Sequence, residues 1–284
     1  MTAQIIDGKA LAKTVRHEVG QTISKLSQDA PKPGLAVVLV GEDPASQVYV
    51  RHKERAAKEV GVEAIDIKRP ESTTTHDLLS LISELNTDPK IHGILVQLPL
   101  PKHIDEKKVL DSISPFKDVD GFHPENIGLL AQGRPRYVAA TPKGCMRLIR
   151  EHCAEIQGKK AVVVGRSNIV GKPMAMLLTE ANATVTLCHS KTMDLPKVCS
   201  EADILIAAVG RPEFIKGEWL KTGSTVIDVG INRDASSGKL IGDVEYNEAC
   251  KIAGAITPVP GGVGPMTIAS LLENLLLAYN VSRA

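Results

Sequence analysis

The stretch KKAVVVGRSNIVGKP, residues 159–173, decides the fold class. Its first half, 159–165, is the unbroken apolar run of a strand buried on both faces of a parallel sheet. Its second half, 165–173, is a glycine-bounded loop that opens a helix, where backbone N–H groups can receive a dinucleotide pyrophosphate. The spacing is G-x-S-x-x-x-G and not G-x-G-x-x-G, so a plain strand-to-helix turn stays open as the alternative.

Strand-like and helix-like segments alternate on both sides of this stretch, which predicts an α/β fold with a mostly parallel sheet. Asp43-Pro44 supplies an N-cap and a first-turn proline for one helix, and Thr75 marks the start of another around 75–86. A third helix is expected over 105–113. The strands are expected at 34–41, 62–68, 93–98, 159–165, 183–189, 202–210, 224–230 and 254–259.

The region 114–141 is rich in proline, glycine and polar residues and has no steady periodicity. We interpret it as a loop that approaches a domain boundary, after which Thr141-Pro142 caps a helix over 142–153. The sequence thus predicts an N-terminal α/β catalytic domain, 1–139, and a Rossmann-like nucleotide-binding domain, 140–265. The amphipathic terminal helix, 266–284, is expected to pack back on the first domain.

Composition narrows the class of protein. The chain has 34 Lys and Arg against 33 Asp and Glu, which gives no reason to expect a nucleic-acid partner. Five cysteines without a CxxC pair favour a reducing compartment, so we expect a cytoplasmic protein. The longest apolar stretch is interrupted by Glu273 and Asn274 and is too short to span a membrane. No histidine spacing suggests a metal site.

The cofactor can be narrowed further. An NAD site usually has a carboxylate at the end of the second strand for the ribose hydroxyls. Here that strand ends at Cys188-His189-Ser190, and Arg166 stands inside the glycine loop. Because a guanidinium can bind a 2′-phosphate through two parallel hydrogen bonds, the predicted cofactor is NADP.

The segment YVRHK, 49–53, places Tyr49 and Lys53 one helical turn apart on one face. Such a pair is either a chance surface feature or an acid–base device. Short-chain dehydrogenases carry Tyr-x-x-x-Lys downstream of the cofactor loop, whereas here the pair precedes Gly165. If the pair is functional, it belongs to another domain that faces the nicotinamide across a cleft.

Several segments, in this order, resemble the bifunctional methylenetetrahydrofolate dehydrogenase/methenyltetrahydrofolate cyclohydrolase family of the bacterial type. The resemblance spans almost the whole chain, with one small departure at Ala140, where many members carry Cys before Thr-Pro. The segments are PASQVYVRHK (44–53), GILVQLPLP (93–101), KDVDGFH (117–123), GRSNIVGKP (165–173), CHSKT (188–192) and TPVPGGVGPMT (257–267).

The resemblance implies NADP-dependent oxidation of 5,10-methylenetetrahydrofolate to the methenyl cation and hydrolysis of that cation to 10-formyltetrahydrofolate. Lys53 would be the general acid and base, and Tyr49 would stack on the folate ring. Gln97 would contact Lys53, and Asp120 would bind the pterin amino and ring N–H groups. On the residues alone, Gln97 could be a strand-end cap and Asp120 part of an Asp-Gly turn.

Further residues and properties follow only from the resemblance. The implied homodimer could use the strand around 62–68 or its neighbour, and Arg51 and Lys58 could meet a polyglutamate tail of the folate. Implied pathways are one-carbon metabolism and the purine, methionine and histidine biosynthesis it supplies. A monofunctional dehydrogenase and a non-catalytic NADP-binding scaffold remain alternatives. The implied substrate residues also include Val96, Leu98, Pro99, Pro260, Gly261 and Gly262, and the cofactor residues are Gly165, Arg166, Ser167, Ile169, Ser190 and Ile231.

Overall fold

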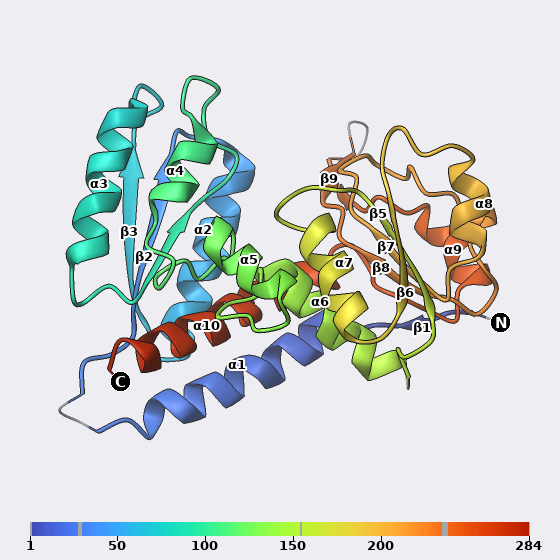
Figure 1. The fold of residues 1–284 in the computed structure, drawn as a ribbon, viewed down its shortest axis with the longest axis horizontal. Helices are drawn as coiled ribbons and strands as arrows, with labels where there is room; N and C mark the ends of the chain where they lie inside the picture. The colour runs from blue at the N-terminus through green and yellow to red at the C-terminus, as the bar shows by residue number, and fades with distance from the viewer. Residues whose placement is uncertain (1, 28–29, 154, 235–237, 284) are drawn as a thin grey trace. The chain divides into compact units, whose positions relative to one another are not determined.

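The computed structural model describes residues 2–27, 30–153, 155–234 and 238–283 (Figure 1). The chain forms two compact units. The six-strand unit comprises Met1–Ala12 and Thr141–Thr267, and the three-strand unit comprises Lys13–Ala140 and Ile268–Ala284. Helices α1 (Gly8–Ser24) and α10 (Val263–Val281) contribute residues to both units.

The six-strand unit is built on a parallel sheet whose strand order is β1-β11-β8-β7-β5-β6. Val164 is in register with Cys188 on one side and Ala207 on the other, so the carboxyl ends of β5, β6 and β7 meet at one edge. The strands are β1 (Gln4–Ile5), β5 (Lys160–Val164), β6 (Thr184–Cys188), β7 (Ile204–Ala207), β8 (Thr225–Asp228) and β11 (Ala255–Ile256). The expected strand segments in this part of the chain are confirmed.

Helices and a hairpin complete the six-strand unit. The antiparallel hairpin joins β9 (Asn232–Arg233) to β10 (Leu240–Ile241). The helices are α6 (Ala140–His152), α7 (Gly171–Glu180), α8 (Leu195–Ser200), α9 (Tyr246–Ile252) and the 3-10 turn Gly217–Trp219.

The three-strand unit has the parallel order β3-β2-β4, with β2 (Gly34–Val40) in the centre and buried along its whole length. Its partners are β3 (Glu63–Arg69) and β4 (Gly93–Val96). Helices α3 (Thr75–Thr87) and α4 (Glu106–Ser112) pack on one face of the sheet. Helices α1, α2 (Pro44–Glu59) and α10 pack on the other face. Both faces are covered, which explains the unbroken apolar run of β2.

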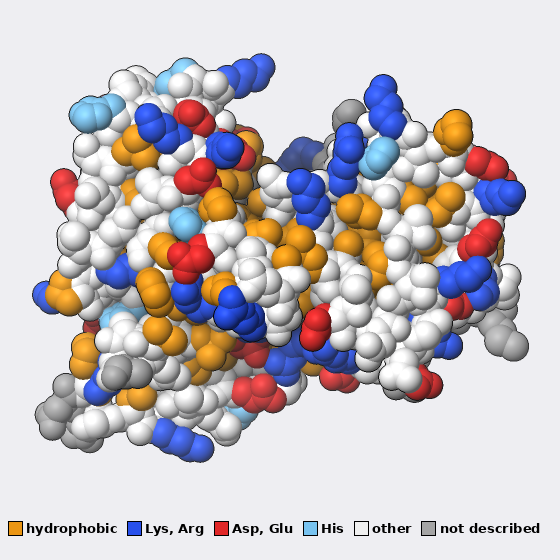
Figure 2. Space-filling model, viewed as in Figure 1, with side chains coloured by type: hydrophobic (Ala, Val, Ile, Leu, Met, Phe, Trp, Pro, Cys, Tyr) orange, Lys and Arg blue, Asp and Glu red, His pale blue; other side chains and the backbone are white. Residues whose placement is uncertain are grey.

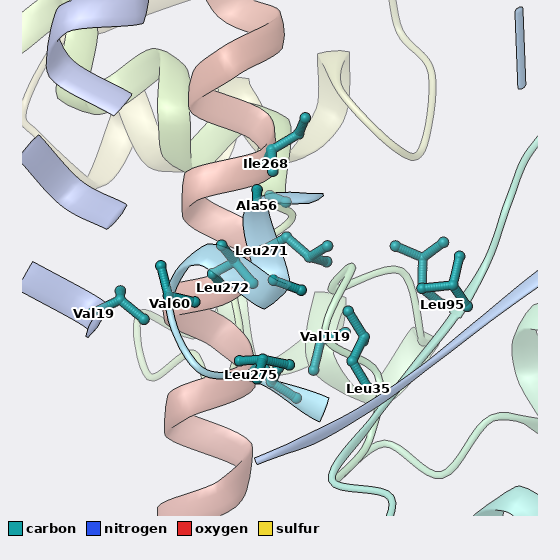
Figure 3. Packing of buried hydrophobic residues seen from close by; sticks show 14 of the residues in the cluster. Val19, Leu35, Ala56, Val60, Leu95, Val119, Ile268, Leu271, Leu272 and Leu275 are labelled. Carbon is teal, nitrogen blue, oxygen red and sulfur yellow. The ribbon is translucent and has the colours of Figure 1, made fainter. Parts of the chain in front are cut away.

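Helix α10 supplies many of the buried side chains that pack against α1, α2 and β2 in the three-strand unit (Figure 3). Its Leu271, Leu272 and Leu275 are at most 1% exposed and lie in one cluster with Val19 of α1 and Leu35 of β2. Fully burying one such side chain stabilises the folded state by roughly 1.5–3 kcal/mol. Within this unit, α10 thus packs on the sheet face that Leu35 of β2 lines.

Parts of the sequence prediction were wrong in detail. The region 114–141 is not only loop, because α5 (Pro124–Ala131) begins after the N-cap His123, whose ring accepts from Glu125 N. Eight residues are too few to reveal a helical period. Thr141 does not cap α6 but lies inside it, with its Oγ1 3.0 Å from Thr267 Oγ1. Helix α3, by contrast, begins at Thr75 as expected, directly after the N-cap Thr74, which forms a capping box with Asp77.

Helices α1 and α9 and the β9–β10 hairpin are absent from the sequence prediction. Because β1 pairs with β11, residues 2–12 cluster with the six-strand unit. The predicted domain ranges, 1–139 with 266–284 and 140–265, stay a prediction; Met1 and Ala284 lie outside the described residues.

Charged side chains of both signs are interspersed on the face shown in Figure 2. None of the helices in the described ranges has both the length and the apolar character needed to cross a membrane.

Candidate active site

Lys53 is unusually placed for a lysine, because it is only 5% exposed. It lies on α2, which begins after Asp43, whose carboxylate accepts a 2.7 Å hydrogen bond from Ser46 N. Val50, Lys53 and Ala57 are all buried and follow the i, i+3, i+7 spacing of one helix face. An amine thus occupies a position where the packing favours an apolar side chain.

Two of the predicted residues contact the buried amine. Lys53 Nζ donates to Gln97 Oε1 at 3.2 Å and lies 4.8 Å from the centroid of the Tyr49 ring. Gln97 Nε2 donates to Leu98 O at 2.7 Å, which keeps the amide oxygen turned toward Lys53. The Tyr-x-x-x-Lys pair therefore points inward, and a solvated surface pair is excluded for Lys53.

The electrostatics of this site favour proton exchange. Burial lowers the pKa of Lys53 from its usual 10.5, and the charge of Asp120 partly offsets that shift. Burial raises the pKa of Asp120 to about 6, with the Lys53 charge opposing the rise and Asp118 adding to it. The pKa values of the amine and the carboxyl therefore move toward each other, which is the direction that suits acid–base chemistry.

Asp120 stands on a turn that a second carboxylate organises. Asp118 is 2% exposed and accepts from the backbone N–H groups of Gly121, Phe122 and His123 at 3.1, 3.1 and 2.8 Å. Asn126 Nδ2 donates to the same carboxylate at 2.8 Å. The Asp-Gly turn suggested by the sequence is thus present, but Asp118 makes it, and this leaves the Asp120 side chain to interact with Lys53.

The turn is also fixed from the side of α10. Asn274 is fully buried and its Nδ2 donates to Val119 O and Val138 O, both at 2.8 Å. Gly121 has a φ of +74°, and a Cβ there would lie 2.6 Å from Ala139 N. Sequence reasoning missed Asp118 and Asn274 as supports. The available signals were an extra aspartate before the Asp-Gly pair and a polar residue in an apolar helix.

The remaining residues of this group follow β4. Val96 ends the strand and is buried, and Gln97 N continues the pairing by donating to Val38 O at 2.8 Å. Leu98 is half-buried and Pro99 is exposed, with a cis peptide bond between them. The chain therefore leaves the sheet at Gln97, and parallel sheets commonly bind ligands beyond the carboxyl ends of their strands.

The glycine loop of the six-strand unit has the tight geometry that its sequence requires. Gly165 has a φ of +124°, and a Cβ there would lie 2.0 Å from Ala208 O. A Cβ at Gly171 would lie 1.9 Å from Gly165 O. Ser167 Oγ accepts from Val170 N and Gly171 N at 3.2 and 3.3 Å. Serine thus stabilises a turn whose glycines no larger residue could replace without moving the backbone.

Side chains suited to a phosphate stand at the same sheet edge. Arg166 and Ser190 are exposed, and they follow the paired strands β5 and β6. Within the described ranges the Arg166 guanidinium has no intramolecular ion pair, so it is available to an anion. Ile169 in the loop is half-buried.

The last predicted residues follow β8 and β11. Ile231 is 54% exposed, which is unusual for a large apolar side chain. Pro260 is exposed, whereas Gly261, with a φ of +114°, and Gly262 are buried. A Cβ at Gly262 would lie 2.6 Å from Thr257 Cβ, so this loop is packed closely against its own strand. Among the residues that the structure describes, no group of three or more His, Cys, Asp or Glu could hold a metal ion.

Comparison with known proteins gives one consistent result. The family model described as tetrahydrofolate dehydrogenase/cyclohydrolase, catalytic domain, matches residues 6–120, and the NAD(P)-binding domain model of that family matches residues 139–283. A curated relative, the bifunctional protein FolD of Moorella thermoacetica, is 60% identical over 278 residues, which cover 98% of this chain and 99% of the relative.

Solved structures agree. The bifunctional enzyme FolD from Campylobacter jejuni has a TM-score of 0.94 at 46% identity, covering 98% of this chain and 99% of that chain. The Trypanosoma brucei methylenetetrahydrofolate dehydrogenase-cyclohydrolase, described as complexed with NADP cofactor and inhibitor, has a TM-score of 0.96 at 40% identity, covering 100% and 99%.

Proposed function

Because this chain belongs to the tetrahydrofolate dehydrogenase/cyclohydrolase family, we propose that it oxidises 5,10-methylenetetrahydrofolate with NADP and hydrolyses the methenyl product to 10-formyltetrahydrofolate. The single observation that carries the second activity is the buried amine of Lys53 with its lowered pKa. A residue kept only for surface charge would not be buried, since desolvating an unpaired ammonium is costly.

The oxidation needs positioning more than proton transfer. NADP, when bound, supplies the acceptor for the hydride. The six-strand unit would hold it through the backbone at Gly165, Ser167 and Ile169, with Arg166 and Ser190 at the 2′-phosphate. Ile231 would lie at the nicotinamide end. The Arg166 guanidinium is exposed and has no ion pair with any described residue, which supports NADP over NAD, because a guanidinium and a phosphate match in charge and geometry.

The hydrolysis needs a group that takes a proton and returns it. Neutral Lys53 would accept a proton from the attacking water as its oxygen bonds to the methenyl carbon, and would then deliver a proton to the leaving ring nitrogen. Gln97 would hold the amine through its 3.2 Å contact, and the Tyr49 ring would pack on the folate. Asp120 would accept from the pterin amino and ring N–H groups, a two-point contact that suits a carboxylate.

Other substrate contacts are proposed from the family alone. They are the strand-end residues Val96, Leu98 and Pro99 and the loop Pro260, Gly261 and Gly262. For a polyglutamate tail, Arg51 is exposed on α2, while Lys58 Nζ already pairs with Glu54 at 2.6 Å. Arg51 is therefore the better candidate of the two.

We further propose a homodimer formed through β3. This strand lies at an edge of its sheet and, among the described strands, pairs only with β2. Ile65 in its middle is 49% exposed, and an open edge strand is a natural site for strand addition. Sedimentation of the wild type and of Ile65→Lys tests this, with a shift toward monomer expected for the variant.

The five unbridged cysteines support a reducing compartment, so we place the enzyme in the cytoplasm. There it would supply one-carbon units for purine, methionine and histidine biosynthesis. This placement rests on the family and on cysteine usage.

The deciding experiment follows absorbance in two reactions. Purified protein is mixed with methylenetetrahydrofolate and NADP, and separately with methenyltetrahydrofolate alone. NADPH formation together with methenyl decay above the spontaneous rate is expected. Methenyl accumulation beside NADPH would indicate a monofunctional dehydrogenase. Folded protein that binds NADP and turns over neither folate would indicate a non-catalytic scaffold.

A further inference from the structure

We infer that Asp243 is a positioning residue for the oxidation. With Asp228 it holds together the two loops that follow β7 and β8, at the sheet edge where the nicotinamide end of NADP is proposed to bind. The inference rests on the proposed function, because it assigns these loops to the cofactor.

Asp243 gathers hydrogen-bond donors from two separate loops. It is completely buried, and its Oδ2 accepts from Val209 N at 2.6 Å and Gly210 N at 2.9 Å. Its Oδ1 accepts from Arg211 N and from Asn232 Nδ2, both at 2.9 Å. One carboxylate therefore ties the loop after β7 to the residue that follows Ile231.

Asp228 anchors Asp243 in turn. It is the last residue of β8, is 1% exposed, and accepts from Asp243 N and Val244 N at 2.9 Å. It also accepts from Gly230 N at 2.9 Å, while its own N–H donates to Thr257 Oγ1 at 2.8 Å. The backbone on both sides of Ile231 is thus bound, directly or through Asn232, to one of two buried carboxylates.

Two glycines leave the room that this network needs. A Cβ at Gly230 would lie 2.3 Å from Asp243 Oδ1, and a Cβ at Gly242 would lie 1.8 Å from Asp228 Oδ2. Real Cβ atoms do not approach oxygen so closely. The two carboxylates and the two glycines therefore form one tightly packed arrangement.

The location gives the network its consequence for the cofactor. In open parallel sheets the dinucleotide binds beyond the carboxyl ends of the strands. The loop after β7 also adjoins the glycine loop, because Ala208 O limits the space at Gly165. The network thus holds the loops after β7 and β8, both at the carboxyl ends of the strands. Small displacements at a reacting centre cost large factors in rate, so a loosened network should slow hydride transfer.

The proposed hydrolysis uses no NADP, so it serves as a control in the same protein: a general loss of structure would lower both reactions, whereas a loosened cofactor site would lower only the oxidation. The test measures both reactions in Asp243→Asn, which keeps the side-chain shape but turns an amide toward backbone donors. Oxidation is expected to fall by about 10- to 100-fold in kcat/KM for NADP, in line with misplacement effects. Methenyl hydrolysis by the same protein is expected to stay within about twofold.

Asp203→Asn is the matched control. Asp203 belongs to the same unit and accepts from Lys160 N at 2.9 Å and Lys221 Nζ at 2.6 Å, but it precedes β7 at the opposite end of the strand. It is expected to lose stability without separating the two reactions. Parallel loss of both reactions in Asp243→Asn, or unchanged oxidation, would overturn the inference.

Two measurements keep the test decisive. If Asp243→Asn fails to fold, Asn232→Ala is used instead, because it removes only the link from Asp243 to the loop after β8. This variant is expected to lower oxidation by a smaller factor and to retain hydrolysis. Equal loss of both reactions in Asn232→Ala would count against the inference. Titration calorimetry of NADP reports directly on the loops. If the wild type binds NADP but does not oxidise the folate, the proposed function fails, and with it the role of Asp243 in the oxidation; weaker NADP binding by the variant would then show only that Asp243 holds the cofactor loops.

Discussion

Lys53 and Asp243 are both ionisable groups buried in a protein interior, yet their surroundings differ sharply. Asp243 receives four N–H donors at 2.6–2.9 Å. Among the described residues, Lys53 Nζ has one hydrogen-bond acceptor, Gln97 Oε1, at 3.2 Å. A buried charge is tolerated when hydrogen bonds replace its lost hydration. The carboxylate has that replacement and acts as an anchor, whereas the amine lacks most of it and its pKa falls.

The same contrast occurs within one turn of the three-strand unit. Asp118 accepts four hydrogen bonds, while Asp120, two residues later, has a pKa raised to about 6. Burial alone does not separate reactive groups from structural ones. The four hydrogen bonds of Asp118 fix its turn, whereas Asp120 faces the charge of Lys53, and this difference can be tested by mutation.

The largest effect is expected for Lys53→Met, which removes the amine and keeps the length of the side chain. Methenyl hydrolysis should fall by about 10²- to 10⁴-fold, the usual contribution of a general acid–base group. Oxidation should fall less, because it needs no proton transfer. Absorbance assays of both reactions measure the two rates. Arg55→Met, an exposed position on the same helix, is the control. Hydrolysis within threefold of the wild type would remove Lys53 from its proposed role.

Next in size is Asp118→Asn, which should destabilise the protein by about 2–4 kcal/mol, since unpaired buried donors cost roughly 1–3 kcal/mol each. Urea unfolding measures the loss. The folate KM should rise as well, because the turn that carries Asp120 loosens, while NADP affinity should not change. Wild-type stability in the variant would show that the four hydrogen bonds are not what fixes the turn.

A smaller effect should separate two glycines that have the same φ angle. Gly121 and Gly158 both have a φ of +74°, but only at Gly121 would a Cβ meet backbone, 2.6 Å from Ala139 N. Alanine at Gly158 should cost about 1 kcal/mol from the left-handed conformation alone. Alanine at Gly121 should cost roughly 1–3 kcal/mol more through overpacking. Equal losses in thermal unfolding would mean that the turn has room to move.

The sequence predicted what depends on local pattern and missed what depends on distant contacts. β2 and β5 were predictable because strands covered on both faces are apolar throughout. Lys53 was found through its spacing from Tyr49 and through the family resemblance. The supporting residues Asp243 and Asn274 could not be predicted in this way. Asp243 binds Val209, 34 residues away, and Asn274 binds Val119, 155 residues away. Only the folded chain shows which polar residues collect such donors.

The smallest effect concerns stability and depends on pH. The pKa of Asp120 is raised from 3.8 to about 6 in the folded state, so the folded protein binds more protons than the unfolded chain between these values. This group therefore contributes stability that is fully present below pH 3.8 and is lost as the pH rises through about 6. Above that range the desolvated, charged carboxylate destabilises the folded state.

Asp120→Asn removes this charge and should raise the free energy of unfolding at pH 8 by about 1 kcal/mol, which corresponds to a rise in Tm of about 2–4 °C. The raised pKa of Asp120 already includes the attraction to Lys53, and the half-buried carboxylate keeps part of its hydration, so the gain is smaller than the whole shift would give. Near pH 4 the difference between variant and wild type should vanish, because both side chains are then neutral in the folded protein. Thermal unfolding at both pH values measures this. A variant less stable than the wild type at pH 8 would mean that the attraction between Asp120 and Lys53 outweighs the cost of burying the carboxylate, which would place this pair with the anchors and not with the reactive groups.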